Sequence, residues 1–63
     1  MITKFVNETG NIVFAETQED LLSTDIQVGS AIMISGFFYK IQASHIEFVK
    51  NFPPHRVVIV KIA

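Results

Sequence analysis

Cysteine is absent from this 63-residue sequence, which excludes disulfide bonds and thiolate metal sites. Glycine and proline are scarce, and the three isolated glycines form no glycine-rich phosphate-binding loop. No apolar stretch reaches the roughly 18 residues that a membrane span needs. The first residues have neither the basic start nor the apolar core of a signal peptide. We therefore expect a cytoplasmic protein that does not enter a membrane.

Positive charge is also scarce. The chain holds 5 Lys and Arg residues against 6 Asp and Glu residues, a formal net charge of −1. This balance disfavours binding of nucleic acid driven by phosphate contacts. The charges are unevenly divided, because residues 1–35 hold one lysine and five carboxylates, whereas residues 36–63 hold four basic residues and one glutamate. Such a division gives two differently charged faces unless the two halves interleave in space.

Apolar residues, in contrast, are abundant. Hydrophobic residues make up 49% of the chain, and the mean hydropathy is +0.40. One domain of this length, spanning residues 1–63, buries a core that barely offsets its conformational entropy. Small domains usually gain stability from disulfides, a metal or a partner chain. Because cysteine is absent, a partner chain is the stabilising element that fits this composition best.

The pattern of β-branched and aromatic residues predicts five strands. They cover residues 2–6, 12–17, 31–35, 37–48 and 56–63. Turn residues separate them: Gly10, which we expect at positive φ, Gly36, and the two consecutive prolines Pro53 and Pro54. We predict an all-β fold in which five short strands follow one another as a meander and close into a small barrel, because closure removes exposed strand edges.

One segment, residues 17–25, breaks the strand pattern. Thr17 is a candidate cap, and two acidic residues follow it as at the start of a helix. The segment is short, so one or two helical turns and an irregular loop both fit it. In either conformation we expect Leu21 and Leu22 to point inward.

The segment of residues 28–41, "VGSAIMISGFFYKI", resembles a hairpin found in many short SH3-like barrels, several of which are encoded by phages and other mobile elements. The residues that carry the resemblance are Val28, Gly29, Ile32, Ile34, Gly36, Tyr39 and Ile41. The resemblance implies an SH3-like barrel fold and no particular activity.

Alternation along the strands predicts which side chains face the core. The inward set is Ile32, Ile34, Tyr39, Ile41 and Ala43, and the outward set is Met33, Phe38, Lys40 and Gln42. Ile46 and Phe48 are apolar one register later, so we expect a bulge near Ser44–His45 that returns both to the core.

Apolar residues also occupy the second face of several strands. In the last strand, Val58, Val60 and Ile62 line one face, while Val57 and Ile59 line the other. A sheet with one wet face should alternate cleanly between apolar and polar residues. We therefore predict that the second face meets another subunit. The expected interface residues are Met33, Phe37, Phe38, Val57 and Ile59.

The three consecutive aromatic residues after Gly36 have a second interpretation, which is base stacking. Phe37, Phe38 and Tyr39 are a possible platform for single-stranded nucleic acid or a nucleotide. Its phosphate contacts would then come from Lys40, Lys50 and Arg56. The small number of basic residues favours a core-and-interface role for the aromatics instead.

Catalytic and metal-binding patterns are weak. His45, Glu47 and His55 are the one candidate set of three metal ligands, and a polar pair at a bulge or subunit boundary explains them better. No serine lies in a nucleophile-elbow context. We predict no enzyme activity, no catalytic residues and no cofactor.

The sequence thus predicts a non-catalytic small barrel that forms a homodimer or higher oligomer and binds or modulates a larger protein partner. A phage origin is suggested by the resemblance and by the small size of the chain. The alternatives are a single-stranded nucleic-acid or nucleotide binding module and a structural component of a larger assembly, such as a virion connector.

Overall fold

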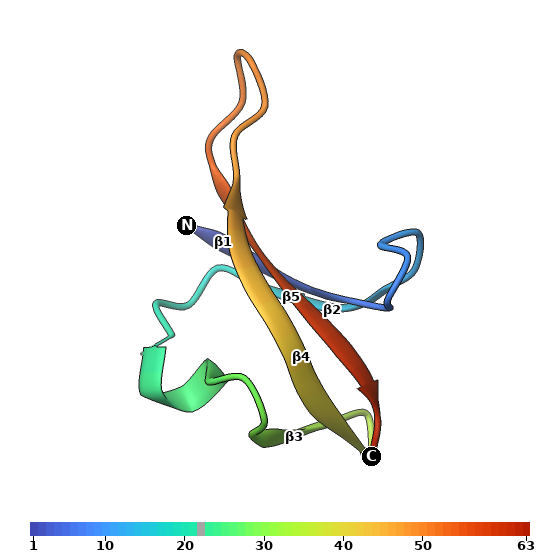
Figure 1. The fold of residues 1–63 in the computed structure, drawn as a ribbon. Coiled ribbons are helices and arrows are strands. Elements are labelled where there is room, and N and C mark those ends of the chain that lie inside the picture. Colours follow the sequence, from blue (N-terminus) through green and yellow to red (C-terminus); the bar gives the residue numbers. More distant parts are fainter. Residues whose placement is uncertain (22) are drawn as a thin grey trace.

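The computed structural model describes residues 1–21 and 23–63, which form one curled β-sheet with a short helix beside it (Figure 1). The elements are β1 (Ile2–Val6), β2 (Val13–Thr17), the 3-10 helix η1 (Ser23–Ile26), β3 (Ala31–Ile34), β4 (Phe37–Glu47) and β5 (His55–Ile62). The predicted all-β, five-stranded, barrel-like fold is confirmed, and η1 overlaps the predicted excursion over residues 17–25. Among the described residues, no helix is long and apolar enough to cross a membrane.

The strand order differs from the predicted meander. It is β2-β1-β5-β4-β3, so the last strand lies at the centre of the sheet. β5 pairs in parallel with β1 and antiparallel with β4. In a meander each strand would lie beside its neighbour in the chain, but here the two ends of the chain meet in one sheet. The N-terminal and C-terminal halves are thereby joined through their first and last strands.

The sheet curls into a half-barrel rather than a closed one. β2 and β3 are the outermost strands, and the described pairings leave both as edges. Closure, which we expected because it removes unpaired backbone groups, is therefore incomplete. The interior of the half-barrel stays open between these two strands.

The turn between β3 and β4 was predicted at Gly36 and is confirmed. Ser35 and Gly36 have φ values of 51° and 86°. Two successive positive φ angles are the signature of a two-residue type I′ turn, whose twist matches that of the flanking strands. Gly10 in the β1–β2 turn also has the expected positive φ, 78°.

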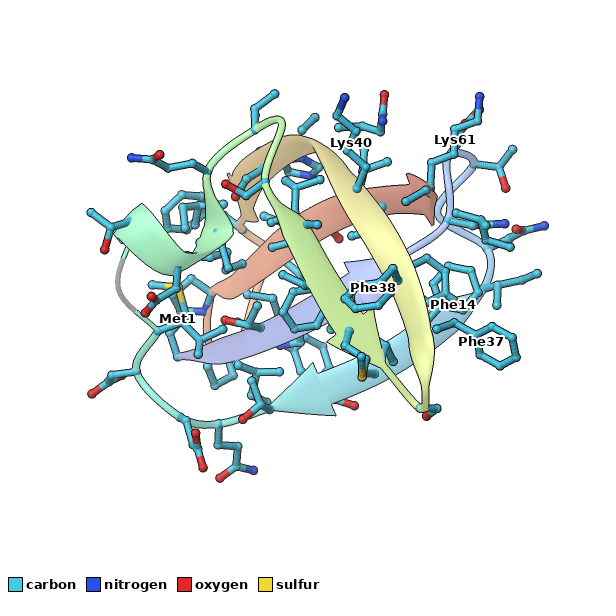
Figure 2. The ribbon with its side chains drawn as sticks, turned by 90° about the horizontal axis from the view of Figure 1, so that it is seen from below. Met1, Phe14, Phe37, Phe38, Lys40 and Lys61 are labelled. Carbon is cyan, nitrogen blue, oxygen red and sulfur yellow. The ribbon has the colours of Figure 1, made fainter. Side chains whose placement is uncertain are left out.

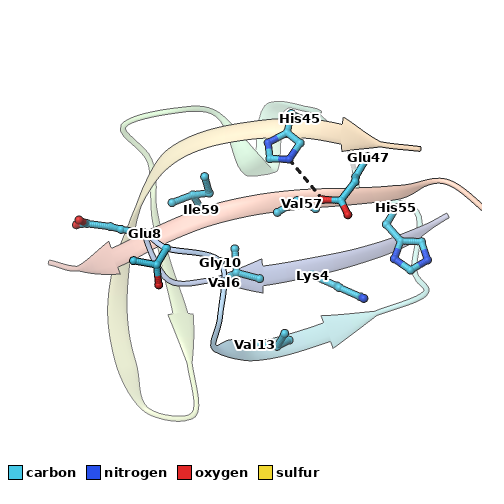
Figure 3. Close-up of a pocket in the computed structure, with 11 residues that line it drawn as sticks. Lys4, Val6, Glu8, Gly10, Val13, His45, Glu47, His55, Val57 and Ile59 are labelled. Atoms are coloured by element: carbon cyan, nitrogen blue, oxygen red, sulfur yellow. Dashed lines mark ion pairs between the residues drawn. The ribbon is translucent and has the colours of Figure 1, made fainter. Parts of the chain in front are cut away.

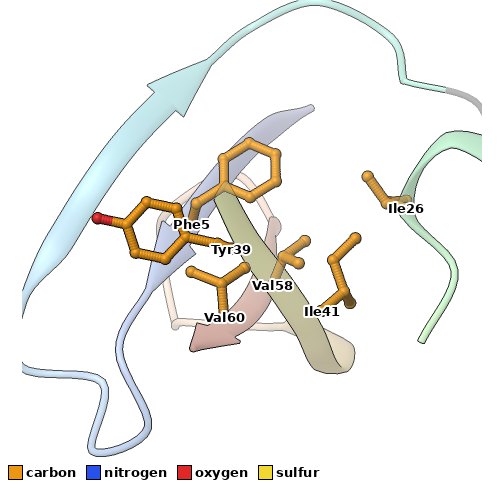
Figure 4. Packing of buried hydrophobic residues seen from close by; sticks show 6 residues of the cluster. All are labelled: Phe5, Ile26, Tyr39, Ile41, Val58 and Val60. Carbon is orange, nitrogen blue, oxygen red and sulfur yellow. The ribbon is translucent and has the colours of Figure 1, made fainter. Parts of the chain in front are cut away.

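The core lies on the inner face of the curled sheet (Figure 4). Its buried cluster consists of Phe5, Ile26, Tyr39, Ile41, Val58 and Val60. Phe14 of β2 packs against the Tyr39 ring with centroids 4.9 Å apart. As predicted, Tyr39 and Ile41 face inward, and Ile32, Ile34 and Leu21 pack partly buried against the cluster. Leu22, also predicted to point inward, lies outside the described residues.

The bulge in β4 lies earlier than predicted. The register with β5 shifts between Ile41 and Ala43, so Gln42 is the extra residue. Ala43 pairs with Ile59 on the face opposite the core, which we call the outer face. The prediction that Ala43 faces inward, and that the bulge falls near Ser44–His45, is therefore wrong.

The predicted core positions of Ile46 and Phe48 are also wrong. Their side chains are 39% and 80% exposed. Both lie where β4 leaves the body of the half-barrel and runs toward the protruding hairpin seen at the top of Figure 1. None of the described residues forms a second layer over the sheet there, so correct alternation along the strand does not produce burial.

Candidate functional site

A groove of about 410 Å³ lies on the outer face, across β1, β4 and β5 (Figure 3). Its floor is apolar and includes Val6, Val57 and Ile59. Its rim is polar and is supplied by Lys4, Glu8, His45, Glu47 and His55. An apolar floor with a few converging polar groups is the usual composition of a binding site. We call this site the outer groove.

The two histidines and the glutamate that could form a ligand set all reach the rim of the outer groove. His45 Nε2 lies 3.9 Å from Glu47 Oε2, and both side chains are about half exposed. Glu47 is the cross-strand partner of His55. The described residues nevertheless contain no cluster of three or more His, Asp or Glu side chains that could hold a metal ion. The exposed pair suits hydrogen bonding to a polar partner better than ligation.

The aromatic hairpin, which we define as Met33, Phe37 and Phe38, projects its side chains into solvent (Figure 2). The three side chains are 59%, 63% and 58% exposed. Met33 and Phe38 are cross-strand partners on the outer face, as predicted. Phe37 is the first residue of β4, at the end of the sheet where β3 turns into β4. The hairpin is therefore an apolar surface outside the core.

Val57 and Ile59, the other two predicted interface residues, belong to a different part of the outer face. Both are partly buried in the floor of the outer groove. The structure therefore does not join all five predicted interface residues into one patch. It separates them into the aromatic hairpin and the outer groove.

A third apolar surface was missed by the sequence analysis. Residues 48–54 form the tip of the β4–β5 hairpin, which we call the finger. Phe48, Val49 and Phe52 are 80%, 47% and 67% exposed there. The two prolines that follow Phe52 marked the segment as a loop, but Phe48 was assigned to the core. The signal that could have revealed the finger is the length of the apolar run before the prolines. A run of this length extends beyond the part of the sheet that a small core can cover.

The tip of the finger is a tight turn. The Phe52 amide donates a hydrogen bond to the Val49 carbonyl at 3.0 Å, and Asn51 has a φ of 69°. Lys50 is the one charged residue in the finger. The turn, together with Pro53 and Pro54, restricts the backbone on both sides of Phe52.

The basic residues predicted to contact phosphates do not converge. Lys50 lies at the tip of the finger, whereas Lys40 lies on the outer face of β4 opposite Lys61 of β5. Arg56 instead turns toward the chain itself, and its Nη1 donates a hydrogen bond to the Leu21 carbonyl at 3.2 Å. Arg56 thus ties the segment before η1 to β5. Its predicted role as a nucleic-acid contact has no support in this arrangement.

No family model, curated protein or solved structure matches this chain. Three surfaces of the chain itself, the aromatic hairpin, the finger and the outer groove, are the features that can indicate a function.

Proposed function

We propose that the protein is a non-catalytic interaction protein that self-associates and docks on a larger protein. The observation that carries the proposal is the exposure of phenylalanine. Of the chain's 6 phenylalanines, four are 58% to 80% exposed, namely Phe37, Phe38, Phe48 and Phe52. Burial of a large aromatic side chain contributes roughly 1.5–3 kcal/mol. A fold that leaves this much apolar surface in water is best explained if another chain covers it.

The balance between exposed and buried side chains supports the same conclusion. Among the described residues, twelve large hydrophobic side chains are exposed and seven hydrophobic residues are buried. A chain of this length needs nearly all of its apolar surface to offset its entropy. Covering the exposed set with a second copy supplies the stability that the internal core lacks.

Self-association should weaken when the aromatic hairpin is made polar. We expect the Phe37→Ser/Phe38→Ser variant to raise the dissociation constant by more than about tenfold, because two exposed rings lose their apolar contact. Sedimentation equilibrium measures this constant directly. Val28→Ser, which alters a 67% exposed valine in a loop outside the aromatic hairpin, is the matched control and should associate like the wild type. Equal constants for all three proteins would contradict the assignment of the hairpin to an interface.

The outer groove is the surface that we assign to the larger partner. Its apolar floor can bury an apolar side chain of the partner. Its mixed-charge rim can form hydrogen bonds with the partner's polar backbone around that side chain. With the wild type as bait, affinity capture from the native host should retain a larger protein. The Glu47→Lys bait, altered only at the exposed rim, should lose it. A larger protein held equally by both baits would show that the groove is not the docking site.

The phage origin belongs to the proposal as well. Its support is the resemblance of residues 28–41 to a hairpin of short SH3-like barrels, several of which are phage-encoded. Small size and an excess of exposed apolar surface are both compatible with a protein that acts by docking.

One observation favours a second candidate function, which is binding of single-stranded nucleic acid. Phe38 and Lys40 share the outer face of β4, and Lys61 lies opposite Lys40. We expect such binding to be weaker than about 100 µM, because the few basic residues neutralise few phosphates. Fluorescence anisotropy with short oligonucleotides at two salt concentrations measures it. A salt-sensitive micromolar complex that weakens in Lys40→Ala would favour this candidate over protein docking.

A further inference from the structure

The open side of the half-barrel contains an apolar groove, which we call the inner groove. It has a volume of about 460 Å³ and is walled by β1, β2, β3 and η1. Ile32 and Ile34 of β3 and Ala15 of β2 contribute its apolar walls, and Met33 of the aromatic hairpin lies at its rim. Asp25 is the one charged residue among the described residues that line it. The groove therefore combines apolar walls with a single negative charge.

The finger has the complementary composition. Phe48, Val49 and Phe52 are exposed around one positive charge, that of Lys50. The segment around Asp25 is acidic more widely, since residues 16–26 hold four carboxylates and no basic residue. The apolar and charged character of the finger thus matches that of the inner groove. Because the turn and the two prolines already restrict its backbone, the tip of the finger would lose less conformational freedom on docking than an unstructured segment.

The finger cannot fill the inner groove of its own chain. In Figure 1 it protrudes at one end of the molecule, beyond β4 and β5, while η1 and β3 lie toward the other end. The longest dimension of the molecule is 35 Å. A finger that occupies this groove would therefore have to come from a second copy.

We propose that each copy inserts its finger into the inner groove of another copy, so that two copies lie side by side with their long axes antiparallel. Each copy offers one finger and one groove, so reciprocal insertion closes the pair with two identical contacts. Phe48 and Phe52 enter the apolar groove, and Lys50 meets Asp25. This inference rests on the proposed self-association and names its geometry.

A charge exchange between two chains tests the contact. Lys50 and Asp25 are both exposed in the single chain, so their replacement leaves the core intact. We expect Lys50→Asp alone and Asp25→Lys alone to associate roughly 3- to 30-fold more weakly than the wild type, because each places like charges together. An equimolar mixture of the two variants restores opposite charges at both contacts. The mixture should form a heterodimer with nearly the affinity of the wild type.

Controls separate this contact from a general effect of charge. Lys40→Asp and Glu8→Lys make the same charge changes outside the finger, the inner groove and the acidic segment of residues 16–26, and both should associate like the wild type. The Phe48→Ser/Phe52→Ser variant should weaken association by more than about 100-fold, because both rings lose their apolar contact. Circular dichroism of each variant verifies that the fold is retained.

The outcomes distinguish the inference from the proposed function. If the wild type associates, while the finger variant and both charge variants associate equally well, insertion of the finger is wrong and self-association stands. A mixture no tighter than its two components also overturns the inference. If the wild type is monomeric up to about 1 mM, both the proposed self-association and its geometry are wrong.

Discussion

Replacement of Ile41 by alanine should lower the free energy of unfolding by about 2–5 kcal/mol. Ile41 is 1% exposed in the middle of β4 and belongs to the buried cluster with Val58 and Val60. Removal of its side chain leaves a cavity that the surrounding strands cannot fully close. A domain of this length has a total stability of only about 3–9 kcal/mol. We therefore expect a large unfolded fraction at physiological temperature, measured by thermal and urea denaturation followed by circular dichroism.

Ile62→Ala is the matched control for this prediction. It makes the same chemical change in β5, but the Ile62 side chain is 69% exposed at the end of the strand. Its unfolding free energy should stay within about 0.5 kcal/mol of the wild type. If the two variants lost equal stability, the inner face would not be the main core of the molecule.

The melting temperature should depend strongly on protein concentration. Self-association stabilises the folded chain by mass action, because the second copy binds only the native state. A hundredfold rise in concentration above the dissociation constant adds about 2.7 kcal/mol for each dimer, or roughly half of that for each chain. For a domain of this size, we expect an increase of roughly 5–10 °C. Scanning calorimetry at two concentrations measures it.

The finger variant Phe48→Ser/Phe52→Ser is the control for the concentration dependence. Both rings are largely exposed in the single chain, so the variant should retain the melting temperature of the dilute wild type. Its melting temperature should then change little on concentration. A wild type with a concentration-independent melting temperature would argue that its exposed apolar surface is not covered by a second copy.

Much of the fold follows from local features of the sequence. The strand segments are rich in β-branched and aromatic residues, and the turns at Gly10 and Gly36 require positive φ, which glycine adopts freely. Alternation placed Tyr39 and Ile41 in the core and Met33 in solvent, as the structure shows. These features act over a few residues, so they can be read without knowledge of the tertiary structure.

The pairing of distant strands could not be predicted in this way. The parallel pairing of β1 with β5 joins residues from opposite ends of the chain, and alternation within either strand is the same whatever its neighbour. The bulge at Gln42 depends on the register between β4 and β5, which the sequence of β4 alone does not specify. Incomplete closure likewise depends on the distance between β2 and β3 in the folded chain.

The candidate surfaces were predicted in part. Phe37 and Phe38 were recognised as aromatic residues in excess of what the core needs, and the structure exposes both. Phe48 was misassigned because alternation along a strand shows which face a side chain is on. It does not show whether other residues pack on that face. The inner groove was not foreseen, because its walls come from strands far apart in the sequence.

Light scattering across a dilution series tests the central claim, self-association, most directly. The chain has a mass of 7.1 kDa. We predict a weight-average mass that approaches twice this value at micromolar or higher concentration and falls toward the monomer value on dilution, as expected for a reversible dimer. A mass that stays at 7.1 kDa at every concentration up to about 1 mM would contradict the account.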